Sequence, residues 1–333
     1  MAVAERILAL SAAPAPSGGA ALRADRILTQ AAAWAGELTR SPLGGVCVRA
    51  RGKKAVPRLL LTAPMDTPGF VVTGQRGGFL RLSPLGGAEL RALPAQELRL
   101  LTPEPVSGVV CAMPPHVLRR EDMELCPGAD AIWLDTGHAG EIPLGTFAVF
   151  AGECRILGRR ISAPGAGNTA AAAAVLEAAS LLQERAPELP FALGFTAQHR
   201  LGSRDAAAVC RWAEPEIILA VDTVPEDKAI LGKGPALTIG PCGDRSLLEE
   251  LEARARELRL PVQRVVVPGR CGSDLWVMQT AGTGAVCARL AIPTRYPDTP
   301  VEMVDLDDCA GAAALLASWC AGIREEAEPC WNC

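Results

Sequence analysis

The pattern of hydrophobic and polar positions changes twice along the chain. Residues 58–63 form a short continuous apolar run, which is typical of a strand buried on both faces of a sheet. From about residue 69 to residue 158, short alternating segments are separated by Gly and Pro, and this pattern predicts a small domain of short β-strands. Residues 1–40 have a helical pattern that is broken by a turn at residues 14–19.

After residue 160, predicted strands alternate with predicted helices. Asn168 or Thr169 is suited to begin a helix that runs to about residue 185, and Asp244 and Asp305 are suited to begin later helices. The other expected elements are a helix at residues 203–212 and strands at residues 190–196, 216–222, 262–267 and 285–292. This alternation predicts an α/β fold with a mainly parallel sheet that helices cover on both faces.

The region of short strands is therefore expected to be an insertion. On this interpretation, an α/β domain consists of residues 1–68 and 159–333, and residues 69–158 form an inserted small β-barrel domain. The length of 333 residues agrees with about two domains. The 49% of hydrophobic residues are enough for a large core, and this composition excludes intrinsic disorder.

Charge and cysteine content narrow the class of protein further. A formal net charge of −4 without a long basic run argues against nucleic-acid binding. No apolar run is long enough for a membrane span, because Glu177 interrupts the alanine-rich segment. The first residues lack a secretory pattern, so the 12 cysteines are expected to be reduced thiols in the cytoplasm. The role of the terminal pair, Cys330 and Cys333, stays open.

Polar residues gather where the predicted strands end. Ligands of open parallel sheets bind beyond the carboxyl ends of the strands. Those ends carry Asp66, His199, Asp222 and the loop that contains Asp298, and the predicted helix start at residues 165–169 belongs to the same edge. We therefore expect these segments to converge on one crevice.

Several motifs resemble those of the tetrahedral-type (TET) metallo-aminopeptidases, the glutamyl aminopeptidase and endoglucanase-like family. They follow one another in the family's order and spacing over nearly the whole chain: Pro16-Ser17-Gly18, Ala63-Pro64-Met65-Asp66, Gln198-His199-Arg200, Leu231-Gly232-Lys233-Gly234 and Pro300-Val301-Glu302. The resemblance implies a zinc-peptidase-like fold with an inserted β domain. It also implies peptide hydrolysis by two zinc or cobalt ions that share a bridging Asp, with a Glu as general base.

Carried over residue by residue, the resemblance implies that most metal ligands are replaced. The first His ligand falls on Pro64, and the bridging Asp falls on Gly167. A Glu ligand falls on Arg200, and the last His ligand falls on Asp298. Asp222 is the one ligand position of five that is unchanged.

The positions around the metal ligands are altered as well. The general-base Glu falls on His199, whereas Asp66 keeps the position that orients the first His ligand. A guanidinium opposes metal binding because it has only donors and stays charged, and Asp222 and Asp298 could pair with Arg200 instead. We therefore expect no cofactor and a pseudoenzyme with a scaffold or regulatory role. Its expected partners are further copies of itself or an active paralogue.

A first alternative is an active aminopeptidase with a rebuilt mononuclear site. Asp222 and Asp298 would hold one metal ion. His199 would be the general base, because imidazole titrates near neutral pH.

A second alternative is a module that binds a carboxylate or phosphate. Gly167, Asn168 and Thr169 precede or begin a helix, so their backbone N–H groups would face the crevice. Arg200 would complete the anion site.

Overall fold

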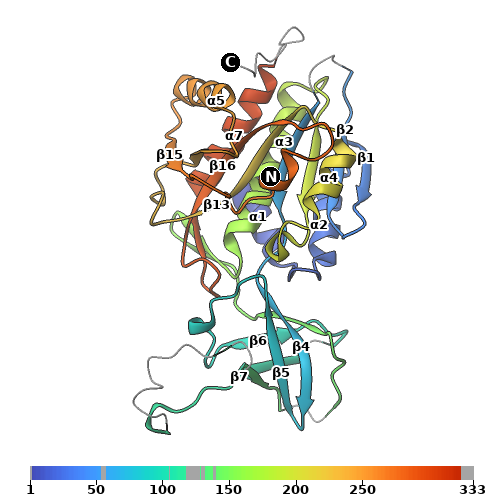
Figure 1. Cartoon of the computed structure of the whole chain (residues 1–333), viewed down its shortest axis with the longest axis vertical. Coiled ribbons are helices and arrows are strands. Elements are labelled where there is room, and N and C mark those ends of the chain that lie inside the picture. Colours follow the sequence, from blue (N-terminus) through green and yellow to red (C-terminus); the bar gives the residue numbers. More distant parts are fainter. Residues whose placement is uncertain are drawn as a thin grey trace.

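The computed structural model describes residues 2–53, 58–104, 106–117, 128, 132–137 and 140–323. Cys330 and Cys333 lie outside these residues. Figure 1 shows a larger α/β part that carries both ends of the chain and a smaller β part below it.

An 11-stranded sheet forms the centre of the larger part, and its main path runs in the order β1-β2-β12-β3-β13-β16-β17-β11-β10. The strands are β1 (Ala35–Arg40), β2 (Val46–Ala50), β3 (Leu59–Pro64), β10 (Arg155–Leu157), β11 (Arg160–Ser162), β12 (Ala192–Thr196), β13 (Ile217–Pro225), β14 (Ala236–Ile239), β15 (Gln263–Val266), β16 (Val286–Arg295) and β17 (Met303–Asp305). The predicted fold class is confirmed, in the form of a mixed sheet. Strands β12, β3, β13 and β16 are parallel, and the flanking pairs are antiparallel.

Helices cover both faces of this sheet, and the central strands are therefore buried on both sides. All six residues of β3 are buried, and they alternate between two cores: Leu59 and Leu61 belong to one, and Leu60 belongs to the other. The first core contains α1 (Val3–Ser11), α2 (Ala21–Ala31), α3 (Ala166–Arg185), α5 (Arg245–Glu257) and α7 (Leu306–Ala321). The second contains α4 (Ala206–Ala213) and α6 (Leu275–Met278).

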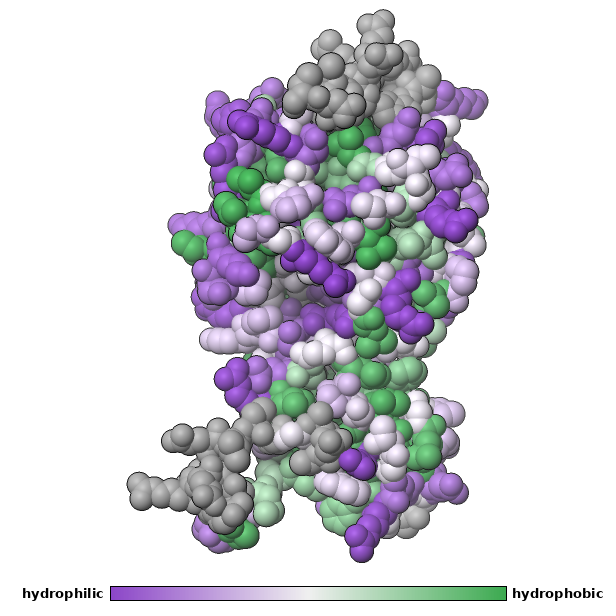
Figure 2. Space-filling view, in the orientation of Figure 1, coloured by the Kyte–Doolittle hydropathy of each residue, from purple (hydrophilic) through white to green (hydrophobic). Residues whose placement is uncertain are grey.

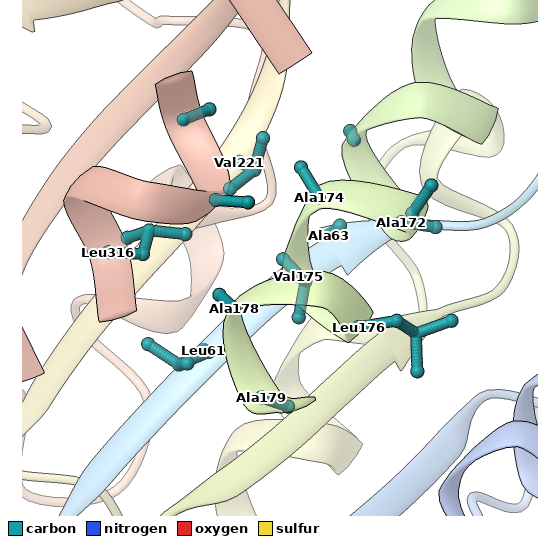
Figure 3. Packing of buried hydrophobic residues seen from close by; sticks show 14 of the residues in the cluster. Leu61, Ala63, Ala172, Ala174, Val175, Leu176, Ala178, Ala179, Val221 and Leu316 are labelled. Carbon is teal, nitrogen blue, oxygen red and sulfur yellow. The ribbon is translucent and has the colours of Figure 1, made fainter. Parts of the chain in front are cut away.

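The alanine-rich helix α3 lies deep in the first core. Figure 3 shows Ala174 and Ala178 near Leu61, Val221 and Leu316, which come from two strands and α7. Small side chains let α3 approach both the sheet and α7 closely, and close packing is what stabilises a protein interior. The predicted start of this helix at Asn168 or Thr169 is slightly late, since α3 begins at Ala166.

The prediction of helix over residues 1–40 is wrong at its end. Residues 35–40 form β1, which pairs antiparallel with β2 at the edge of the sheet. Most of its residues are at least partly exposed, so the strand has no hydrophobic period that distinguishes it from an amphipathic helix.

The smaller part is a closed barrel with the strand order β4-β5-β8-β7-β6-β9. Its strands are β4 (Gly69–Arg76), β5 (Phe79–Leu85), β6 (Glu97–Leu100), β7 (Val106–Val110), β8 (Trp133–Asp135) and β9 (Phe147–Phe150). Inward-facing residues of these strands fill it, and the rings of Phe70 and Phe150 meet edge to face at 5.4 Å. Strand β10, which lies within the range predicted for the insertion, pairs with β11 in the large sheet.

Short 3-10 helices lie in connecting segments, among them η1 (Leu90–Ala92), η2 (Pro115–Val117) and η5 (His199–Leu201). Figure 2 shows hydrophilic residues over much of the visible face of the α/β part. Within the described ranges, no helix combines the length and the hydrophobicity that crossing a membrane requires.

Candidate functional site

The predicted crevice lies at the carboxyl ends of the central strands, beside the barrel. Asp66 follows β3, His199 and Arg200 begin η5 after β12, and Asp298 follows β16. Asp222 lies within β13, in register with Ala291 of β16. The structure therefore brings the predicted segments together, but their side chains make contacts that the sequence does not specify.

Asp66 is fully buried and anchors the start of η5. Its carboxylate accepts hydrogen bonds from the hydroxyl of Ser17 at 2.5 Å and from the backbone N–H groups of His199 and Arg200, both at 3.2 Å. Burial raises the pKa of Asp66, and these donors oppose that shift. The side chain thus positions the two residues that follow β12.

The imidazole of His199 is bound to a carboxylate that sequence reasoning missed. Nδ1 of His199 lies 2.9 Å from Oδ1 of Asp274, and the hydroxyl of Thr196 donates to the other oxygen of Asp274. Burial by itself lowers the pKa of His199, but the charge and hydrogen bond of Asp274, with the charges of Asp222 and Asp66, raise it to about 9. A ring that is protonated at neutral pH is a donor, which argues against the general-base role for His199.

Arg200 forms the predicted ion pair with Asp298. Nη1 of Arg200 donates to the carboxylate of Asp298 and, at 3.1 Å, to the carbonyl oxygen of Gly86 in the barrel. Gly86 has a positive φ of 75°, and a Cβ atom there would lie 2.9 Å from Cβ of Arg200. The barrel loop therefore approaches Arg200 as closely as a glycine allows.

Asp222 does not pair with Arg200, contrary to the prediction. Its Oδ2 lies 3.6 Å from Nε of Arg289, and its Oδ1 accepts the N–H of Thr223 at 2.8 Å. The side chains of Asp222 and Arg289 are 5% and 6% exposed. Arg289 lies among apolar residues of β16, where a buried charge requires a partner, and this was the signal that could have revealed the pair.

Gly167 is closely packed at the position where the resemblance places the bridging Asp. Its N–H donates to Oε1 of Glu302 at 3.1 Å. A Cβ atom at Gly167 would lie 2.6 Å from that oxygen and 2.6 Å from Cγ2 of Thr223. Burial raises the pKa of Glu302 to about 7, against the opposing charge of Arg200.

Asn168 and Thr169 use their side chains within the protein. Nδ2 of Asn168 donates to the carbonyl oxygen of Asp66 at 2.7 Å, and Oγ1 of Thr169 donates to the carbonyl oxygen of Gly165 at 2.8 Å. Both residues are buried. The contact of Asn168 ties the start of α3 to the segment after β3, and the contact of Thr169 stays within the first turn of α3.

The donor set does not fit the two metal ions that the resemblance implies. Pro64 has no ligating atom in its side chain, and both candidate ligands face a guanidinium: Asp298 that of Arg200, and Asp222 that of Arg289. Within the residues that the structure describes, no three His, Cys, Asp or Glu side chains form a group that could hold a metal ion. A pair of divalent ions needs several convergent carboxylates or imidazoles.

A cleft of about 330 Å³ opens beside these residues. Its charged lining consists of His199, Arg200 and Arg270, and its other lining residues are Gly and Ser. Sequence reasoning missed Arg270, because it lies in a Gly-rich loop without periodicity or motif. Gly167, Asn168 and Thr169 are not among the residues that line this cleft.

Known proteins resemble this chain over most of its length. The family model for M42 glutamyl aminopeptidase matches residues 44–315. A lysyl aminopeptidase of Pyrococcus furiosus is 31% identical over 315 residues, which cover 89% of this chain and 88% of that protein.

Solved structures share the whole fold. The aminopeptidase APDkam598 of Desulfurococcus kamchatkensis superposes with a TM-score of 0.89 at 25% identity, over 97% of this chain and 96% of that one. The TET1 peptidase of Pyrococcus horikoshii has a TM-score of 0.82 at 22% identity, over 95% and 98% of the two chains. The match of the family model over most of the chain, the curated relative and the shared fold confirm the resemblance, and the chain belongs to the M42 glutamyl aminopeptidase family.

Proposed function

We propose that this chain is a catalytically impaired member of its family, with a scaffold or regulatory role. The ion pair of Arg200 and Asp298 carries the proposal. Arg200 puts a guanidinium at a position where the resemblance implies a Glu ligand. The same guanidinium binds Asp298, the carboxylate that replaces the last His ligand.

The charge of Arg200 opposes a divalent ion strongly. At about 4 Å and an effective dielectric constant near 20, a guanidinium repels a divalent ion by about 8 kcal/mol. Asp298 offsets part of this repulsion, but the contact with Arg200 already engages that carboxylate. Metal binding would have to displace Arg200 from the carboxylate of Asp298 and from the carbonyl oxygen of Gly86.

Two further contacts support the proposal. Glu302 and Thr223 fill the space beside Gly167, so a bridging carboxylate there would require both side chains to shift. His199 at the general-base position is held by Asp274 in a form that donates a proton to a hydrogen bond and does not accept one.

We further propose that the chain acts as a homo-oligomer or in a joint assembly with an active paralogue. The TET1 peptidase of P. horikoshii can assemble into a tetrahedron or a large octahedral shell. Light scattering at micromolar concentration would give the mass of the particle, and a monomer would contradict this part of the proposal.

The test of impaired catalysis combines metal analysis with an activity assay. The purified protein is dialysed against zinc or cobalt, its metal content is measured, and hydrolysis of lysyl and glutamyl anilides is followed. The lysyl aminopeptidase of P. furiosus serves as the active control. We expect no turnover that depends on added metal.

Two results would contradict the proposal. Turnover with two metal ions per chain would show that the dinuclear centre persists. One metal ion per chain with turnover, both lost in Asp222→Ala, would instead support the mononuclear aminopeptidase.

A further inference from the structure

We propose that the cleft beside His199, Arg200 and Arg270 binds a small molecule through a carboxylate or phosphate group. The inference rests on the proposed loss of the metal centre, because it assigns the same edge of the sheet to an anion. The anion site predicted from the sequence lies at the start of α3, but Gly167, Asn168 and Thr169 already donate to protein acceptors there. We therefore place the anion in the cleft instead.

His199 offers the first donor. Its Nδ1 is engaged by Asp274, and within the described residues its Nε2 has no hydrogen-bond partner. The contact with Asp274 fixes the orientation of the ring, and its charge and hydrogen bond raise the pKa of His199, which favours a proton on both nitrogens. In that form Nε2 is an N–H donor, and no described residue accepts from it.

Arg200 offers an unused edge of its guanidinium. Its two acceptors among the described residues, Asp298 and the carbonyl oxygen of Gly86, both bind Nη1. Nε is buried and has no hydrogen-bond partner in the described part of the chain. The guanidinium therefore keeps donor capacity that Asp298 and Gly86 do not use, and its side chain lines the cleft.

Arg270 adds a positive charge that no described carboxylate pairs with. It is exposed in the segment between β15 and α6, and no ion pair of Arg270 with another described residue is present. The cleft lining itself carries no carboxylate. Asp274 and Asp298 pair with His199 and Arg200, and the buried Asp66 lies close to both, so Arg270 is the positive charge of the lining that these carboxylates do not pair with.

The size of the cleft limits the ligand. A volume of about 330 Å³ is at the lower end of the range for small-molecule sites, which is about 300–1,000 Å³. Small glycines and serines around the cations leave space for a compact acid or phosphate monoester.

The test is calorimetric titration of the full-length protein with inorganic phosphate and with succinate, after treatment with EDTA and dialysis into chelator-free buffer. Because EDTA removes metal, binding here does not depend on the outcome of the metal and activity measurements. We expect saturable binding of at least one probe. Binding of phosphate alone would identify a phosphate group as the ligand, and binding of succinate alone would identify a carboxylate. In Arg270→Ala the affinity should fall about tenfold, as the loss of a charge-assisted contact predicts.

Arg256→Ala is the matched control, because it removes one exposed positive charge from α5. It should bind the probe like the unaltered protein. His199→Gln should also bind more weakly, and its thermal unfolding shows whether it folds. Equal affinities of the Arg270→Ala and Arg256→Ala variants, or no saturable binding of either probe, would overturn the proposal.

Discussion

Nδ1 of His199 lies 2.9 Å from Oδ1 of Asp274, so the residue at the general-base position is paired with a buried acid. The aspartate comes from the start of α6, far along the chain from the strand end that carries His199. This contact determines which protonation state His199 has.

Asp274→Asn should return the pKa of His199 from about 9 toward or below its ordinary value of 6.5. Because the folded-state pKa lies above the unfolded one, the interaction stabilises the protein fully below pH 6.5, and the stabilisation is lost as pH rises to about 9. It amounts to at most about 3 kcal/mol. NMR titration of His199 and urea unfolding at several pH values would measure both effects. An unchanged His199 titration in the variant would contradict the assignment.

Glu302→Gln should reduce the pH dependence of stability in a second window. Burial raises the pKa of Glu302 from 4.5 to about 7, so the folded protein loses stability as pH rises between these values. The difference in free energy of unfolding between the variant and the unaltered protein should therefore depend on pH. It should favour the variant by up to about 3 kcal/mol more at pH 8 than at pH 4. The comparison is made by urea unfolding at both values. An equal difference at both pH values would show that folding does not shift the pKa of Glu302.

Gly167→Ala should destabilise the protein, although alanine is usually the better helix former. The added Cβ would contact Glu302 and Thr223 at 2.6 Å, and overpacking of this kind costs about 1–3 kcal/mol. Thermal unfolding measures the loss. Gly269→Ala is the control, because a Cβ there meets nothing within 4 Å. If the two variants unfold at the same temperature, the site around Gly167 has more space than described.

Asp222→Asn should cost about 3–5 kcal/mol of unfolding free energy, because it leaves the buried charge of Arg289 without its partner. The double variant Asp222→Asn with Arg289→Met should recover part of that loss, since neither charge remains. Chemical unfolding of the single and double variants gives the coupling free energy. A purely additive effect would mean that the two side chains do not interact.

The sequence was sufficient for the fold where burial follows a regular pattern. The apolar run at residues 58–63 predicts β3 because that strand is buried on both faces. The edge strand β1 was missed because it is largely exposed and has no such pattern.

The site was predictable only in part. The pair of Arg200 and Asp298 follows from opposite charges at two strand ends that converge. Asp274 and Arg270 could not be placed, because they lie in loops whose approach to His199 depends on the whole fold. Asp222 was given the wrong partner because the sequence does not show which of two arginines is nearer.

The ion pair at the crevice also joins the two parts of the molecule. Arg200 donates to the carbonyl oxygen of Gly86, and the carbonyl oxygen of Asp298 accepts the N–H of Glu89 at 3.0 Å. The segment after β5 thus supplies one acceptor, to Arg200, and one donor, to Asp298. The two residues that oppose metal binding therefore also hold the segment after β5 against the α/β part, so a change at either position would affect the junction of the two parts as well as the crevice.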